Sequence, residues 1–244
     1  MTDALTSPAP VPGLFARVIG VIFSPKSTFE KLVPSPRVFG ALLLVGLVIG
    51  LAQGLPQLTA TGRQVAIDAA AQQMERFTGQ PVTPEQYANM MKTAPYRAIG
   101  TIVLSPAFVA VTMLFFGGLY FVIFNVVLGG TASYKQVMSI VSHAGVITAL
   151  GVLLAAPVQY IQGTANPMGP FTLTAALPML EENSFLARML GFISVFSIWQ
   201  TFVTGIGLGV LYHRKAGNII LGLFVLSLTF AAIFASIMGM FSGR

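Results

Sequence analysis

The stretch VFGALLLVGLVIGLAQGL, residues 38–55, decides the fold of this chain because it is apolar throughout and carries no charge. A helix of that length rises about 27 Å, which is close to the ~30 Å hydrocarbon core of a bilayer. Gly46, Gly50 and Gly54 repeat at a spacing of four residues, so they share one side of the helix. Glycines on one face let another helix approach closely within a membrane. The stretch therefore predicts a membrane span with a packing face of three glycines.

The composition points the same way. The chain of 244 residues is 55% hydrophobic and 8% charged, whereas soluble domains carry about 25% charged residues. Too little charge remains to cover a soluble protein of this size, so we expect an integral membrane protein. The net charge is +6, with the basic residues outside the apolar runs, which suits anionic lipid headgroups and not nucleic acid. The absence of cysteine excludes disulfides, thiol catalysis and thiolate metal sites.

Four further apolar runs follow the first one. The sequence predicts an all-α membrane protein with five transmembrane helices, over about residues 38–55, 99–128, 136–158, 189–212 and 219–241. A Pro-rich tail, residues 1–13, is predicted to be disordered, and residues 14–244 are predicted to form a single membrane domain. An odd number of spans would put the two termini on opposite sides of the membrane.

Two short amphipathic helices are predicted before the first span. In residues 14–23 an apolar face contains Phe15, Val18, Ile19 and Ile22, and Arg17 lies off that face. Ser24 can cap the second helix, which starts at Pro25 and carries Phe29, Leu32 and Val33 as its apolar stripe. Such helices either lie in the membrane surface or pack on the protein's own cytoplasmic side, and the sequence leaves both open.

The longest polar segment, residues 57–97, is predicted to form a helical hairpin outside the bilayer. Thr83 and Gln86 have the spacing of a capping box, with Pro84 at the first helical position. The hairpin is either a binding lid or a covering connection.

The predicted orientation places the N-terminus in the cytoplasm and the C-terminus outside. The inner segments then hold seven Lys and Arg residues and the outer ones six, which is almost a tie. Arg37 adjoins the first span, and the short turn before the last span contains Arg214 and Lys215, so the residues nearest the spans favour this orientation.

Three patches of the sequence, which are Arg17 with residues 23–30, residues 129–136, and a set between residues 166 and 216, together resemble the Yip family (Ypt-interacting proteins) in its bacterial form. Residues 23–30, FSPKSTFE, are similar to the run before the first span of the family. Residues 129–136, GGTASYKQ, are similar to its double-glycine turn, and the third patch comprises Asn166-Pro167, residues 196–199 (FSIW) and the glycine-rich stretch 205–216, which ends in Lys-Ala.

The resemblance implies a five-span protein of a bacterial inner membrane. Eukaryotic members are Golgi and endoplasmic-reticulum proteins linked to Rab GTPases and vesicle formation, and bacterial members have no agreed activity. The Asp-Leu-Tyr-Gly-Pro motif of the eukaryotic trafficking members does not occur in this sequence.

Candidate site residues lie within the third and fourth predicted spans. His143 is the one ionisable side chain inside the five spans, and intramembrane ionisable residues are functional hypotheses by default. Ser197 and Thr201 lie on a polar face of the fourth span and could line a path with His143. The competing interpretation is that all three form interhelical hydrogen bonds. Ser142 precedes His143 directly, but adjacent helical residues point about 100° apart, so no nucleophile and base pair is predicted.

The leading functional prediction is a non-enzymatic membrane scaffold or interaction protein that organises lipid. The alternative is a transporter or permease-like subunit for a small molecule or lipid. No catalytic residue, metal cluster or cofactor motif is predicted, and the expected partners are membrane lipids, a membrane protein or a second copy of the chain.

Overall fold

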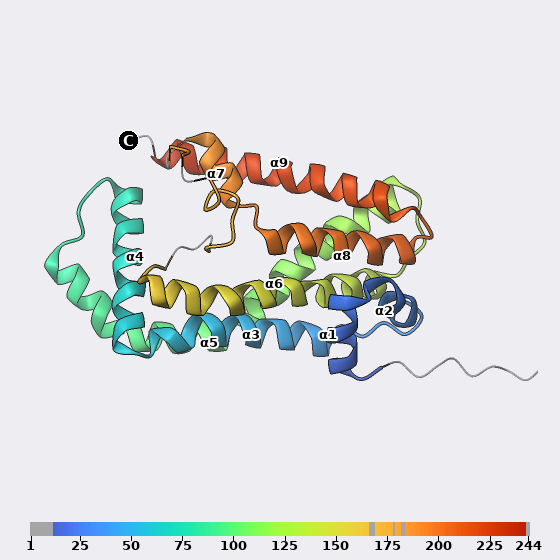
Figure 1. Ribbon diagram of the computed structural model, residues 1–244, viewed down its shortest axis with the longest axis horizontal. Helices are drawn as coiled ribbons and strands as arrows, with labels where there is room; N and C mark the ends of the chain where they lie inside the picture. Colours follow the sequence, from blue (N-terminus) through green and yellow to red (C-terminus); the bar gives the residue numbers. More distant parts are fainter. Residues whose placement is uncertain (1–11, 166–168, 178, 182–183, 243–244) are drawn as a thin grey trace, which may run out of the picture.

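The computed structural model describes residues 12–165, 169–177, 179–181 and 184–242 (Figure 1). Across this part of the chain the structure is all-helical, and its β pairing is limited to one isolated bridge between Thr172 and Ser194. The disordered tail predicted for residues 1–13 falls mainly on residues 1–11, which lie outside the described residues. The helices follow in the order α1 (Leu14–Phe23), α2 (Pro25–Leu32), α3 (Phe39–Gln57), α4 (Ala60–Thr78), α5 (Pro84–Phe121), the π-helix η1 (Val122–Val127), α6 (Tyr134–Gln162), α7 (Phe185–Gly191), α8 (Val195–Leu211) and α9 (Ala216–Ser242).

Five helices, α3, α5, α6, α8 and α9, lie along the long axis of the molecule, and successive ones run in opposite directions (Figure 1). Helices α1 and α2 lie at one end of this bundle, next to the turns that follow η1 and α8. We call this the basic end. Helix α4, the start of α5 and helix α7 lie at the opposite end, which we call the hairpin end.

Four helices among the described residues are long and apolar enough to cross a membrane: α3, α5 with η1, α6 and α9. Each overlaps one of the predicted spans. The second predicted span, residues 99–128, is part of a longer helix, because α5 starts at Pro84 and continues through Pro95 and Pro106. The predicted start at Thr83 is confirmed, since its side chain and that of Gln86 form both hydrogen bonds of a capping box.

The span predicted over residues 189–212 is not one helix. It is divided into α7 and α8, and α8 alone has 17 residues, fewer than the other four long helices. Ser194 explains the break, because its hydroxyl accepts a hydrogen bond from the Ser197 backbone at the start of α8. The backbone on either side of Ser194 also pairs with residues 171–173, through the N–H of Leu173 and the N–H of Val195.

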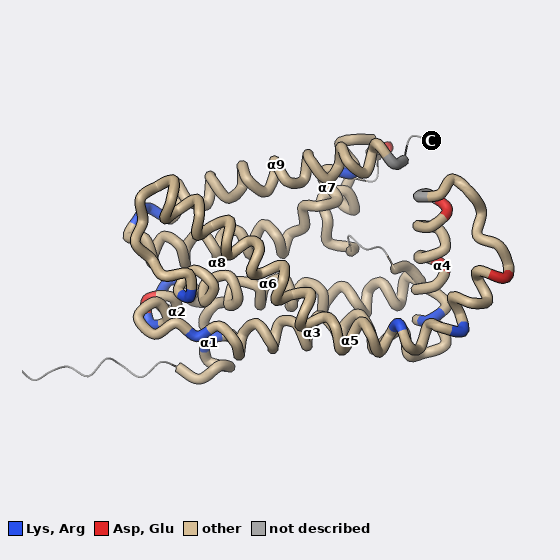
Figure 2. Tube along the Cα trace, turned by 180° about the vertical axis from the view of Figure 1, so that it is seen from behind, with Lys and Arg blue, Asp and Glu red and all other residues tan. Residues whose placement is uncertain are grey.

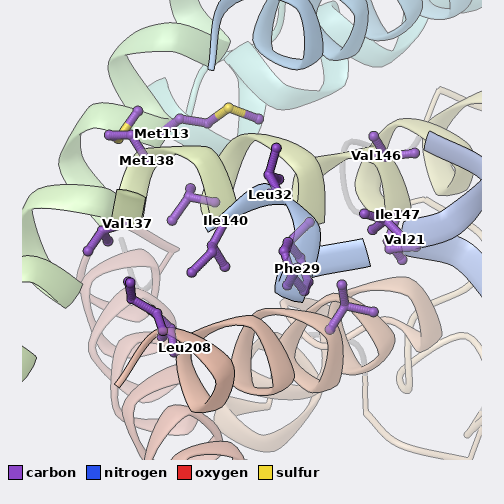
Figure 3. Close-up of a cluster of buried hydrophobic side chains, with 14 of the residues drawn as sticks. Val21, Phe29, Leu32, Met113, Val137, Met138, Ile140, Val146, Ile147 and Leu208 are labelled. Atoms are coloured by element: carbon purple, nitrogen blue, oxygen red, sulfur yellow. The ribbon is translucent and has the colours of Figure 1, made fainter. Parts of the chain in front are cut away.

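Helix α6 forms the centre of the bundle. In its most apolar stretch 72% of residues are buried, compared with 22–28% for α3, α5 with η1, and α9. Figure 3 shows Ile140 of α6 between Phe29 and Leu32 of α2 and Leu208 of α8, all of which are buried. Because the other helices each turn one side outward, their exposed apolar side chains are available to contact lipid.

The three glycines of the opening stretch lie against α5. A Cβ on Gly46 would be 2.5 Å from the Cα of Pro106, and one on Gly50 would be 2.9 Å from the carbonyl oxygen of Ile102. Gly54 also faces Ile102. Side chains at these positions would push the two helices apart.

The two ends differ in charge (Figure 2). At the basic end, residues 14–37, 129–135 and 213–215 contain seven Lys or Arg residues and one acidic residue. At the hairpin end, the described residues of the segments 57–97 and 163–188 contain five basic and four acidic residues. The net positive charge of the protein is therefore concentrated at one end.

Candidate functional site

His143 lies in α6 and is fully buried. Its Nδ1 is 2.7 Å from the carbonyl oxygen of Ser139, one helical turn earlier. A carbonyl only accepts hydrogen bonds, so Nδ1 carries the hydrogen and donates it. In the neutral ring Nε2 is then an acceptor, and it has no hydrogen-bond partner among the described residues.

Ser142 and His143 do not form a nucleophile and base pair. The Ser142 hydroxyl donates to the Ser139 carbonyl at 3.2 Å, and it lies 3.5 Å from Nδ1 of His143. Because that nitrogen already donates its hydrogen to the same carbonyl, it cannot accept the hydroxyl proton. The geometry of these two neighbours therefore does not support nucleophilic catalysis.

Ser197 and Thr201 make their hydrogen bonds within α8. Ser197 forms a capping box with Ser194, at 2.8 and 3.0 Å, and Thr201 donates to the Ser197 carbonyl at 2.8 Å. These bonds position the start of α8, and none of them joins α8 to His143. The side-chain bond that does join α6 to α8 connects Thr148 to Gln200, which the sequence did not single out.

A cavity of about 450 Å³ opens between α3, α4, α6 and α8. Ser197 lines it, together with Gln53, Thr148 and Gln159, but neither His143 nor Thr201 is part of its lining. The cavity walls are apolar groups, amides and hydroxyls, and they carry no charged side chain. Such a lining suits a small uncharged molecule.

A second set of polar contacts fastens α6 to the N-terminal segment at the basic end. The Ser139 hydroxyl accepts from the Arg37 backbone N–H at 3.2 Å and donates to the Arg37 carbonyl at 3.1 Å. One turn earlier, the Gln136 amide donates to the Val33 carbonyl at 3.2 Å. The segment between α2 and α3 is thereby held against the central helix.

Arg17 differs most from the sequence prediction. It was expected to lie off the apolar face of residues 14–23 and near the membrane surface, but it is only 8% exposed, and its Nε has no hydrogen-bond partner among the described residues. Burial lowers the pKa of the Arg17 guanidinium, and the charge of Arg37 lowers it further.

The opposite face of α1 is apolar and exposed. Phe15, Ile19 and Phe23 follow one another at a spacing of four residues and are 75%, 58% and 79% exposed. The predicted apolar face of residues 14–23 already included Phe15 and Ile19, and the spacing of four residues extends it to Phe23. Exposed phenylalanines beside a cluster of basic residues are typical of a helix that lies in a membrane interface.

Of the segments that resemble the Yip family, residues 23–30, residues 129–136 and the glycine-rich stretch 205–216 meet at the basic end. Residues 196–199 lie at the other end of α8, and Asn166 and Pro167 lie outside the described residues. A Cβ on Gly207 of α8 would be 3.0 Å from the ring of Phe29 in α2. The turn at Gly130 is equally close to α8, because a Cβ there would be 2.6 Å from the ring of Tyr212. The Tyr212 hydroxyl also donates to Asn125 at 2.8 Å, which fixes the turn after η1.

A comparison with protein-family models agrees with this arrangement, since the model of the Yip1 domain matches residues 19–238. The chain belongs to the Yip1 domain family. A similar relative is the membrane protein YknW of Bacillus subtilis (strain 168), which is 25% identical over 236 residues and is matched over 93% of each chain. No solved structure matches. This Yip1 domain protein is therefore an all-helical membrane protein with a bacterial membrane relative.

Proposed function

We propose that this Yip1 domain protein is a non-enzymatic membrane scaffold that gathers anionic lipid around its basic end. In this proposal the basic end lies at the cytoplasmic face of a bacterial inner membrane. The bundle crosses the bilayer five times, with α7 and α8 together making the fourth crossing, and the C-terminus lies outside.

The observation that carries the proposal is the combination of charge and exposed apolar surface at one end. Six more basic than acidic residues lie in the segments of the basic end, whereas the described residues of the hairpin-end segments contain one more basic than acidic residue. Each Lys or Arg near an anionic surface contributes about 1 kcal/mol of attraction. The exposed phenylalanines of α1 would add apolar burial in the same interface. Both contributions favour a protein that collects negatively charged lipids.

Proteoliposomes that contain self-quenching fluorescent phosphatidylglycerol test the scaffold. Wild-type protein should increase quenching because it concentrates the labelled lipid. The double variant Lys26→Gln/Lys31→Gln should reduce this effect, since both side chains are exposed at the basic end. The control variant Lys92→Gln/Arg97→Gln removes the same charge from exposed positions at the hairpin end and should behave as wild type. Equal quenching by both variants would contradict the proposal.

The uncharged cavity beside Ser197 supports a second candidate, a carrier for a small uncharged molecule. Flux of labelled glycerol into proteoliposomes tests this function. A carrier should transport faster than protein-free vesicles and should slow when Ala156→Leu places a larger side chain in the cavity lining. His143→Ala tests the predicted role of the histidine, and unchanged flux would remove it from the transport path.

A further inference from the structure

A groove of about 630 Å³ runs between η1 and α9, from the basic end toward the middle of the bundle. Phe124, Ile219 and Leu223 form its buried floor. Arg214 and Lys215 lie at its mouth.

Directly after Thr229, the last residue of the groove lining along α9, aromatic side chains join α9 to α5. Phe230 of α9 contacts Phe115 and Phe116 of α5, with ring centroids 6.5 and 5.9 Å apart. Between this contact and the basic end, α9 packs on α8 and not on α5, so the space beside η1 stays open. Along the chain, the lining extends from Lys215, directly before α9, to Thr229, which is about 21 Å of helical rise. One leaflet of the hydrocarbon core is about 15 Å deep, so the groove is long enough for an acyl chain of that leaflet.

The side chains at the mouth can bind an anion. The Arg214 guanidinium is positioned by one hydrogen bond, from Nη2 to the Leu128 carbonyl at 2.9 Å. Lys215 and Asn218 are exposed beside it and present further N–H donors. A phosphate oxygen accepts from such donors, and guanidinium groups bind phosphate with favourable geometry.

We infer that this groove binds one anionic glycerophospholipid from the leaflet at the basic end, with its phosphate at Arg214 and Lys215 and an acyl chain along α9. An anion with a long apolar chain matches both parts of the groove, whereas a free phosphate would leave the apolar floor empty. The π-helix η1 forms the facing wall of the groove. Turns of π-helix are rare in proteins overall, and those that occur are often at functional sites. The inference goes beyond the scaffold proposal, because it concerns one molecule at a fixed site instead of lipid gathered around the surface.

Gly222 provides a direct test. It lines the groove, and a Cβ built there meets no heavy atom within 4 Å, so a larger side chain would enter the open space. Gly217 is the matched control, because it lies in the same helix, also has open space around its Cβ position and does not line the groove.

The assay is native mass spectrometry of the full-length protein in detergent, titrated with phosphatidylglycerol, phosphatidylcholine or inorganic phosphate. Wild type and Gly217→Leu should retain one phosphatidylglycerol. Gly222→Leu should lose it, and Arg214→Gln/Lys215→Gln should weaken binding about thirtyfold. If Gly222→Leu fails to fold, Thr229→Phe blocks the groove at its deeper part.

Each other outcome overturns the inference. Equal retention by Gly222→Leu and Gly217→Leu would place the lipid elsewhere, and equal binding of phosphatidylcholine would remove the role of the basic mouth. A dimer that Gly222→Leu dissociates would show that a second copy of the chain occupies the groove. Lys26→Gln/Lys31→Gln should keep the bound lipid, so failure of the scaffold and failure of this site are distinguishable.

Discussion

Replacing Gly46 by alanine should destabilise the protein, although alanine is the better helix former. The added Cβ would be 2.5 Å from the Cα of Pro106, and carbon atoms prefer separations of about 3.5–4.0 Å. The neighbour is backbone within a helix, so α3 and α5 must separate by about 1 Å. Overpacking costs about 1–3 kcal/mol, and a contact with backbone, which cannot rotate away, puts this substitution in the upper part of that range, at about 2–3 kcal/mol. The gain in helix propensity offsets about 1 kcal/mol of this cost. The expected net loss is about 1–2 kcal/mol.

Thermal unfolding in a mild detergent, followed by circular dichroism, measures this loss. Gly46→Ala should lower the midpoint by roughly 2–8 °C on the scale of chains of this size. Gly118→Ala is the control, because Gly118 lies in α5 with no heavy atom within 4 Å of its Cβ position. That variant should keep or raise the midpoint. If the two variants had the same midpoint, close packing of α3 on α5 would not be the reason for glycine at position 46.

Two further variants test polar groups inside the bundle. Thr148→Val removes the hydrogen bond to Gln200 and leaves that amide unpaired between α6 and α8, so it should lower the free energy of unfolding by about 1–2 kcal/mol. The control Thr112→Val, on the exposed side of α5, should lower it less. Unfolding titrations with urea or dodecyl sulfate compare the two variants. Arg17→Met replaces a buried charge by an apolar side chain of similar length and should raise the unfolding midpoint in lipid-free detergent; a lower midpoint would show that the guanidinium has a stabilising partner.

Local signals in the sequence predicted the helices well. The apolar stretch 38–55 is α3 with shifts of one or two residues at its ends, and the Thr83 capping box begins α5 where expected. Both signals act over three or four residues, so they are complete in the sequence. Ser194 carried a similar capping signal, but the long apolar run around it favoured a continuous span, and the pairing with residues 171–173 was not visible.

Features that depend on contacts between distant segments could not be predicted. The side of α1 that faces the bundle is decided by packing on α6, so the sequence alone did not show that Arg17 would be buried. The groove beside η1 exists because α9 packs on α8, and no single segment contains that information. His143, Ser197 and Thr201 share two neighbouring helices, yet each makes its nearest hydrogen bond within its own helix.

The continuity of α5 has a mechanical consequence. One helix runs from the hairpin end, where the Tyr87 hydroxyl donates to Asp68 at 2.6 Å, to the turn that Asn125 fixes at the opposite end. Each internal proline removes one backbone hydrogen bond, so we expect bending of α5 to concentrate at Pro95 and Pro106. The two prolines divide the helix into three stiff segments. A molecule that pulled on the hairpin would therefore tilt the inner length about Pro106, and the amplitude of that tilt would be limited by α3.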